Sequence, residues 1–151
     1  MIKIITVGTV KEKYLRDAIE EYTKRISKYD KIEIIEVKDE GTVEPVKALI
    51  LEAEKIKKNI NHRDFIITLE IEGKQLTSQE FSSKIESIFL ETSNITFIIG
   101  GSYGLSDEIK NISNFKLSFS KMTFPHQLFR VILLEQIYRA FKISRNESYH
   151  K

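Results

Sequence analysis

The chain has 151 residues, 41% of them hydrophobic, which is enough apolar material for a folded domain with a substantial core. Its 24 Lys and Arg against 22 Asp and Glu give a formal net charge of +2, so overall charge predicts neither a nucleic-acid partner nor an acidic substrate. The absence of cysteine excludes disulfides and thiolate chemistry, and the three widely separated histidines form no local metal motif, so we expect no bound metal.

Apolar runs and helical periodicities alternate along the chain. The predicted elements are, in order, strand 2–7, helix 11–29, strand 31–38, loop 39–45, helix 46–60, strand 64–71, helix 78–91, strand 95–101, a turn and short helix within 102–113, strand 115–120 and helix 125–143. Pro45 suits a first helical turn, and Thr77 with Glu80 has the spacing of a capping box. Such alternation requires a mostly parallel sheet with helices on both faces, so we predict an α/β fold with a single domain over 1–151.

No targeting or membrane segment is evident. The apolar run before Gly8 is too short for the core of a signal peptide, and no stretch approaches ~18 consecutive apolar residues. We therefore expect a cytoplasmic protein with no membrane partner.

Glycines point to a ligand site in the C-terminal half. Three of the six glycines fall in GGSYG (100–104), after the fourth predicted strand, and ligands of open α/β sheets bind at the carboxyl ends of strands. The first strand is followed by GTVKEKY, and neither G-x-G-x-x-G nor G-x-x-x-x-G-K-[ST] occurs, which disfavours a dinucleotide fold and a P-loop. Taken alone, the glycine pair is more typical of a plain turn than of a ligand site.

A second unusual loop follows the fifth predicted strand, in FSKMTFPHQLFR (119–130). Ser118, Ser120 and Thr123 offer hydroxyls, whereas Met122 and Phe124 offer apolar surface. We expect this loop and GGSYG to lie at adjacent strand ends. Backbone donors, few charges and apolar walls suit a flat heterocycle better than a polyphosphate.

Four segments carry a resemblance to a known family: TLEIEGK (68–74), FIIGGSYGLS (97–106), LSFSKMTFPHQLFRVILLEQIYRAFKI (117–143) and SRNESYHK (144–151). Together with the opening 2–29, they resemble the bacterial large-subunit ribosomal RNA pseudouridine N3-methyltransferases of the SPOUT superfamily. The resemblance covers the whole chain in order and spacing. It implies a deep trefoil knot in the C-terminal part of the sheet, with S-adenosylmethionine bound in the knot.

The same resemblance implies partners and site residues. The substrate would be 23S rRNA, within the assembled ribosome, and two chains would pair to complete the active site. Carried over by position, the implied cofactor contacts are Leu69, Gly100, Phe119, Ser120, Lys121, Met122, Thr123 and Phe124.

The last predicted helix supports a homodimer independently of the family. Glu135, Arg139 and Lys142 share one polar face, while apolar residues spread over much of the remaining surface. One sheet does not normally cover so broad an apolar surface, so we predict a homodimer built on this helix. The apolar residues are Leu128, Val131, Leu133, Leu134, Ile137 and Phe141.

Arg130 lies on the apolar side of this helix, where a guanidinium needs a partner. One interpretation is a structural salt bridge with an acid of either chain. The other makes Arg130 a catalytic candidate that reaches the second subunit's site or an RNA phosphate. His126, one turn earlier, is expected to line the pocket at the start of the helix.

Positive charge gathers in the tail and in the first helix. Residues 139–151 hold four Lys or Arg against one Glu, and 11–28 hold six against four acids, which suits a modest RNA footprint. A frayed terminus is the alternative for the tail. Tyr149 and His150 are suited to stack on or hydrogen-bond an unpaired base, so His150 is our candidate general base for the N3 proton, with Tyr149 orienting the ring.

Two other functions fit part of the pattern. A non-catalytic ribosome-assembly factor would keep the fold and bind RNA without chemistry. A flavodoxin-like or nucleotide-binding domain would need a phosphate loop after the first strand, where VGTVKEKY supplies a poor one.

Overall fold

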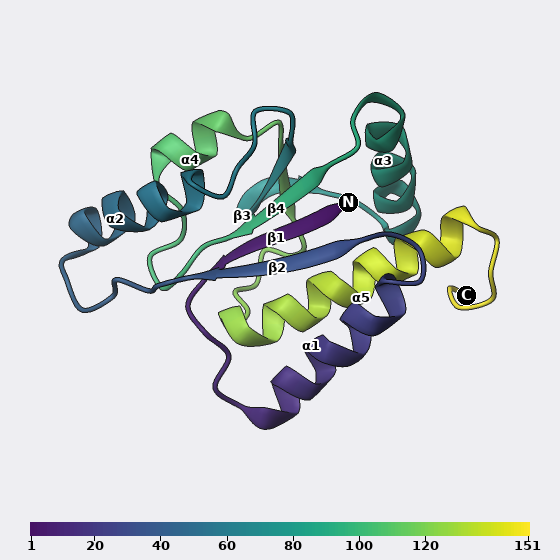
Figure 1. Ribbon diagram of the computed structural model, residues 1–151, viewed down its shortest axis with the longest axis horizontal. Helices are drawn as coiled ribbons and strands as arrows, with labels where there is room; N and C mark the ends of the chain where they lie inside the picture. Colours follow the sequence, from purple (N-terminus) through teal and green to yellow (C-terminus); the bar gives the residue numbers. More distant parts are fainter.

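The computed structural model describes residues 1–151, which form one five-stranded sheet with helices on both faces (Figure 1). The strands are β1 (Ile2–Val7), β2 (Ile32–Val37), β3 (Phe65–Gln75), β4 (Ile95–Ile99) and β5 (Phe115–Ser118). The helices are α1 (Lys13–Ile26), α2 (Pro45–Lys57), α3 (Ser78–Glu91), α4 (Asp107–Ile112) and α5 (His126–Ser144). All strand pairs are parallel, in the order β2-β1-β4-β3-β5, which confirms the predicted fold class.

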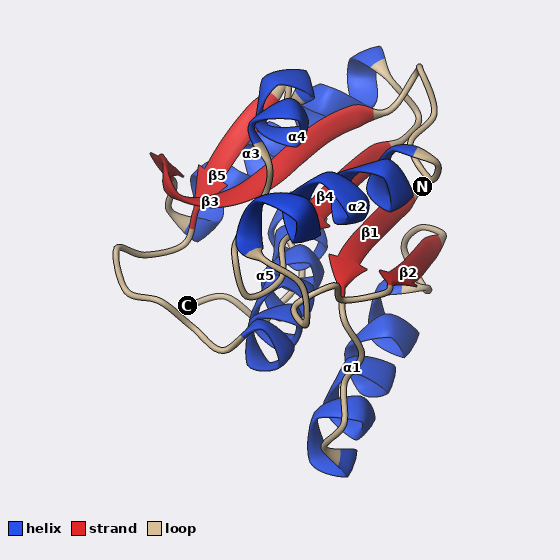
Figure 2. Cartoon of the chain, turned by 90° about the vertical axis from the view of Figure 1, so that its left-hand side faces the viewer, coloured by secondary structure: helices blue, strands red, loops and turns tan.

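The sheet is buried on both faces, as parallel sheets require. The larger core packs beneath α1, α3 and α5 and includes Ile4 of β1, whereas the smaller core packs beneath α2 and α4 and includes Ile5. Figure 2 shows the sheet from its side, with these helices on either side of it. Successive residues of β1 thus serve opposite cores, which explains why all six residues of the strand are buried rather than alternating with exposed ones.

Strand order differs from the expectation in one respect that matters for the site. The strands before the two unusual loops, β4 and β5, are not adjacent, because β3 lies between them. The crossover through α4 carries the chain past β3 before β5 pairs with it, and nothing in the local sequence fixes that choice of neighbour. Both loops therefore lie beside the carboxyl part of β3, which separates the two strands that precede them.

β3 is longer than predicted because its pairing with β5 is interrupted and then resumes. Leu69 and Lys74 both pair with Leu117, so residues 70–73 bulge out of the ladder. Gly73 fits within this bulge because a Cβ there would lie 2.7 Å from the Lys116 carbonyl oxygen. Residues 70–73 therefore make no pairs with β5.

Helix boundaries follow the predicted signals in part. Pro45 begins α2, and the capping box of α3 is present: Thr77 Oγ1 accepts from Glu80 N at 3.1 Å, and Thr77 N donates to Glu80 Oε1 at 2.9 Å. The first helix is shorter than 11–29 and the last begins at His126. β4 ends at Ile99, because Gly100 and Gly101 already belong to the following turn.

The amino ends of the strands are closed by a buried ion pair. Lys3 Nζ lies 3.1 Å from Asp64 Oδ2 and also donates to the Asn59 carbonyl at 2.8 Å. Thr96 of β4 donates its hydroxyl to the same Asp64 oxygen at 2.9 Å. This cluster ties β1, β4 and the turn before β3 together. None of the helices is both long and apolar enough to cross a membrane.

Candidate cofactor-binding site

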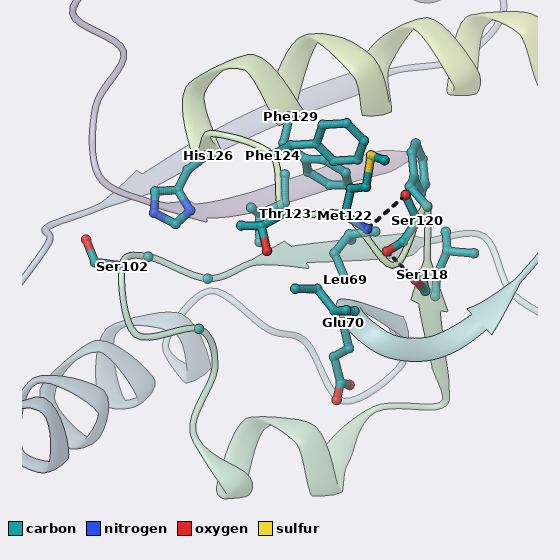
Figure 3. A pocket seen from close by; sticks show the side chains of 17 residues that line it. Leu69, Glu70, Ser102, Ser118, Ser120, Met122, Thr123, Phe124, His126 and Phe129 are labelled. Carbon is teal, nitrogen blue, oxygen red and sulfur yellow. Dashed lines mark hydrogen bonds between the residues drawn. The ribbon is translucent and has the colours of Figure 1, made fainter.

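A cavity of about 240 Å³ opens at the carboxyl ends of β3, β4 and β5 (Figure 3). Four parts of the chain line it: residues 69–71 of β3, the turn 99–104 after β4, the segment 117–124 after β5, and the first turns of α5. Both loops that the sequence singled out contribute to this one cavity, although their strands are not neighbours. Burial of a small molecule among apolar walls with a few polar groups is what such a cavity allows.

The turn after β4 needs its glycines to close. A Cβ on Gly100 would lie 2.4 Å from the Gly104 carbonyl oxygen, and Gly104 has a φ of +76°. Gly104 N donates to Gly101 O at 3.0 Å, which completes the turn. The glycines are therefore explained by the turn itself, and the turn places its backbone against the cavity.

The segment after β5 is held in a compact bend by its own small side chains. Ser118 Oγ donates to Ser120 O at 3.1 Å, and Met122 N donates to Ser120 Oγ at 3.0 Å (Figure 3). Pro125 then directs the chain into α5. Serines in this sequence thus shape the backbone of the bend, which can present amides and carbonyls to a ligand.

Aromatic rings form the apolar wall of the cavity. The ring centroids of Phe119 and Phe129 lie 5.0 Å apart in an edge-on arrangement, and those of Phe124 and Phe129 lie 6.0 Å apart and stacked. Met122 is 75% exposed at the same loop. A flat, apolar ring system can pack against these side chains.

The resemblance implied eight cofactor contacts, and the structure gathers all but one of them. Lys121 is exposed and is not among the lining residues. The predicted residues that line the cavity are Leu69, Gly100, Phe119, Ser120, Met122, Thr123 and Phe124. His126 also lines it, as expected for a residue at the start of the helix.

Glu70 is a lining residue that sequence reasoning missed. It supplies the only carboxylate among the lining side chains, and Thr68 Oγ1 donates to its Oε2 at 2.6 Å. Residue 70 was interpreted as part of an ordinary strand, although it directly follows Leu69. The bulge that contains it has no clear sequence signal besides Gly73.

Arg130 is 3% exposed and does not line the cavity. Its Nη1 lies 2.6 Å from Glu36 Oε2, and its Nη2 donates to the carbonyls of Val7 and Gly8 at 3.1 and 2.8 Å. This matches the structural interpretation, with an acid of the same chain as the partner. Arg130 docks the first turns of α5 on the carboxyl ends of β1 and β2, and its role in catalysis stays a prediction.

The tail packs against α5 rather than extending into solvent. Tyr149 donates its hydroxyl to Glu135 Oε1 at 3.1 Å, and its ring meets that of Tyr138 with centroids 5.0 Å apart. Burial and the Glu135 carboxylate raise the pKa of Tyr149 to about 12, so its hydroxyl stays protonated at neutral pH. Tyr149 is therefore a hydrogen-bond donor here and not a base.

His150 lies 3.1 Å from Arg139, between its Nδ1 and the Nη1 of the guanidinium. A guanidinium only donates, so Nδ1 accepts and a neutral imidazole carries its proton on Nε2. In this arrangement the ring offers no free acceptor, and a general-base role requires His150 to leave Arg139.

Tyr149 and His150 are remote from the cavity of their own chain. The cavity lies at the start of α5 and the tail packs at its end, where Figure 1 places the C-terminus. A helix of 19 residues spans roughly 28 Å at about 1.5 Å per residue. The structure therefore does not bring the predicted catalytic residues and the predicted cofactor residues together within one chain.

The fold is α/β, and its cavity offers backbone and aromatic groups at the carboxyl ends of parallel strands, without a phosphate loop. A family profile described as "Predicted SPOUT methyltransferase" matches residues 1–150. The chain belongs to the SPOUT methyltransferase family, as the resemblance predicted, and the flavodoxin-like alternative is wrong.

Curated relatives match along almost their whole length. A protein of Methanococcus maripaludis named "Putative ribosomal RNA large subunit methyltransferase H" is 60% identical, with 99% of each chain covered. "Ribosomal RNA large subunit methyltransferase H" of Clostridium acetobutylicum is 52% identical, again with 99% of each covered. Among solved structures, a probable methylase family protein from Haemophilus influenzae Rd KW20 superposes with a TM-score of 0.58 at 13% identity, covering 99% of this chain and 70% of the other, which shows a shared fold.

Proposed function

We propose that this chain is an S-adenosylmethionine-dependent ribosomal RNA methyltransferase that methylates N3 of a pseudouridine in 23S rRNA, within the assembled ribosome. The observation that carries the proposal is the 52–60% identity, over 99% of both chains, to proteins named ribosomal RNA large subunit methyltransferase H. The pseudouridine position and the ribosomal context come from the sequence resemblance. The cavity supplies a site of suitable chemistry at the expected residues.

The residues around the cavity fit an adenosyl cofactor. The aromatic wall of Phe119, Phe124 and Phe129 suits a purine, and the backbone of the glycine turn and of the bend 118–124 offers hydrogen-bonding groups. When bound, the cofactor supplies the electrophilic methyl group. Leu69, Gly100 and the bend would hold it, and alignment of methyl and acceptor can remove several kcal/mol, on the order of 7, from the barrier.

The separation of tail and cavity supports the predicted homodimer. A second copy whose α5 runs in the opposite direction beside the first would bring its tail to the cavity, which one chain alone does not. Tyr14 on α1 and Leu128 on α5 are exposed apolar side chains that such a partner would cover. The predicted pairing through the C-terminal helix thus gives Tyr149 and His150 a route to the reacting base.

Within that dimer, the chain's own residues have separate tasks. Tyr149 would orient the target base through its fixed hydroxyl, and His150 would accept the N3 proton after release from Arg139. The trefoil knot implied by the resemblance stays a prediction.

The proposal is tested by mass spectrometry of 23S rRNA from a strain that lacks the protein. Loss of one methylated pseudouridine, restored by the wild-type gene and not by a His150→Ala gene, is the expected result. Unchanged rRNA methylation would overturn the assignment. Titration of the purified protein with S-adenosylmethionine in a calorimeter separates the non-catalytic assembly factor, which would release no heat.

A further inference from the structure

Glu70 is an acidic group without a counter-ion in a cavity whose other walls are aromatic rings, aliphatic side chains, hydroxyls and backbone. Among the lining residues only Glu70 and His126 are ionisable. Figure 3 shows the Glu70 side chain extending away from Met122 and Phe124. A carboxylate in such surroundings is costly unless donors satisfy it.

The position of Glu70 is fixed by groups beneath it. Thr68 is fully buried and its Oγ1 lies 2.6 Å from Glu70 Oε2 and 2.7 Å from Ser113 Oγ. Ser113 Oγ donates to the Phe115 carbonyl at 2.9 Å, so its proton is already used. Thr68 Oγ1 has one proton and two acceptors within reach, and the charged Glu70 carboxylate is the stronger acceptor, so we assign the proton to Glu70; this leaves Glu70 Oε1 and the second lone pair of Oε2 for a ligand.

An ionised carboxylate only accepts hydrogen bonds, so its ligand must bring donors. An adenosyl cofactor brings two kinds, the pair of ribose hydroxyls and the cationic groups of its methionine part. A carboxylate beside the sulfonium would stabilise the charged reactant more than the transition state, in which that charge is leaving, and would slow the transfer. Two neighbouring hydroxyls match two carboxylate oxygens without that penalty.

We propose that Glu70, held in place by Thr68, recognises the ribose hydroxyls of the adenosyl cofactor and makes the cavity selective for ribonucleosides over deoxynucleosides. This rests on the proposed function, because it presumes an adenosyl ligand. Glu70 is then a specificity-determining residue and Thr68 a positioning residue that acts through it.

The experiment combines ligands that lack one ribose hydroxyl with a protein variant that lacks the Glu70 charge. Calorimetry with 5′-methylthioadenosine and its 2′-deoxy and 3′-deoxy analogues measures the value of each hydroxyl without sulfonium or amino-acid groups. For the wild type we expect each missing hydroxyl to weaken binding about tenfold, as for a hydrogen bond to a charged group. For Glu70→Gln we expect methylthioadenosine to weaken by about the same factor and the discrimination to fall to about twofold.

Two further variants sharpen the result. Glu72→Gln changes an exposed acid two residues along the same strand, outside the cavity lining, and should bind like the wild type. Thr68→Val keeps the shape of the buried side chain and should lose part of the discrimination. In the Glu70→Gln background Thr68→Val should have no further effect on discrimination, which a merely structural role of Thr68 would not produce.

Several outcomes would overturn the inference. Full discrimination in a folded Glu70→Gln protein shows that other groups read the hydroxyls. A change in the preference for S-adenosylmethionine over S-adenosylhomocysteine, with deoxy discrimination intact, assigns Glu70 to the cation instead. A wild-type protein that binds none of these adenosyl compounds overturns the proposed function itself.

Discussion

The two ends of the sheet place an acidic side chain in opposite surroundings. At the amino end, Asp64 meets Lys3, the Thr96 hydroxyl and the Asn61 amide, all within 3.1 Å of one carboxylate oxygen. At the carboxyl end, Glu70 has a single fixed donor, Thr68, and faces a cavity. The first carboxylate is enclosed by the fold, whereas the second is left available for a ligand, so similar chemistry serves stability at one end and binding at the other.

The largest effect should come from breaking the amino-end cluster. Lys3→Met leaves the Asp64 carboxylate buried without its counter-ion, and we expect a loss of about 3–5 kcal/mol in the free energy of unfolding by urea denaturation. Cofactor affinity of the remaining folded protein should be unchanged. Lys13→Met, which removes a pair 79% and 57% exposed, is the control and should cost less than about 1 kcal/mol. Equal losses in both variants would contradict a special role for the buried pair.

Breaking the contact between α5 and the carboxyl ends of β1 and β2 should have an intermediate effect. Arg130→Met removes the donors to the Val7 and Gly8 carbonyls, so we expect a loss of about 2 kcal/mol in unfolding free energy. Because Phe129 and His126 lie on the same turns of α5, cofactor binding should weaken while turnover at saturating cofactor is largely kept. A stable variant with normal cofactor binding and turnover lowered about a hundredfold would place Arg130 in the chemistry instead.

Acid should weaken the cluster at the amino end of the sheet. Burial alone would raise the pKa of Asp64, but hydrogen bonds from Asn61, Lys3 and Thr96 outweigh it and hold the pKa below the ordinary 3.8. A lowered pKa means that this stabilisation is complete above the ordinary value and is lost as the pH falls through the folded value. The urea concentration at the midpoint of unfolding should therefore decrease as the pH is lowered below about 4 in the wild type, and it should decrease less steeply in Asp64→Asn. Parallel curves would contradict this account.

The sequence predicted where helices and strands occur better than it predicted which strands pair with each other. Continuous apolar runs fix buried strands, and Thr77 with Glu80 fixes a helix start, because these signals are local. The insertion of β3 between β4 and β5 and the bulge at 70–73 depend on which strands pair, so they have no local signal. The place of Glu70 among the lining residues therefore has no local signal either. The position of the tail was hard to predict for a similar reason. Its contacts with Glu135 and Arg139 depend on how the backbone turns after α5, and composition does not determine that path.

The smallest expected effect concerns Lys121, which the family resemblance implies as a cofactor contact although its side chain does not line the cavity. If the bend binds through its backbone, Lys121→Ala should change cofactor affinity by less than about twofold, because an exposed side chain is removed and the amide stays. Phe119→Ala, which removes a ring of the cavity wall, is the matched comparison and should weaken binding at least about tenfold. A large loss in Lys121→Ala would mean that its ammonium group reaches the ligand. The bend would then bind the cofactor through a charged side chain and not through its backbone alone.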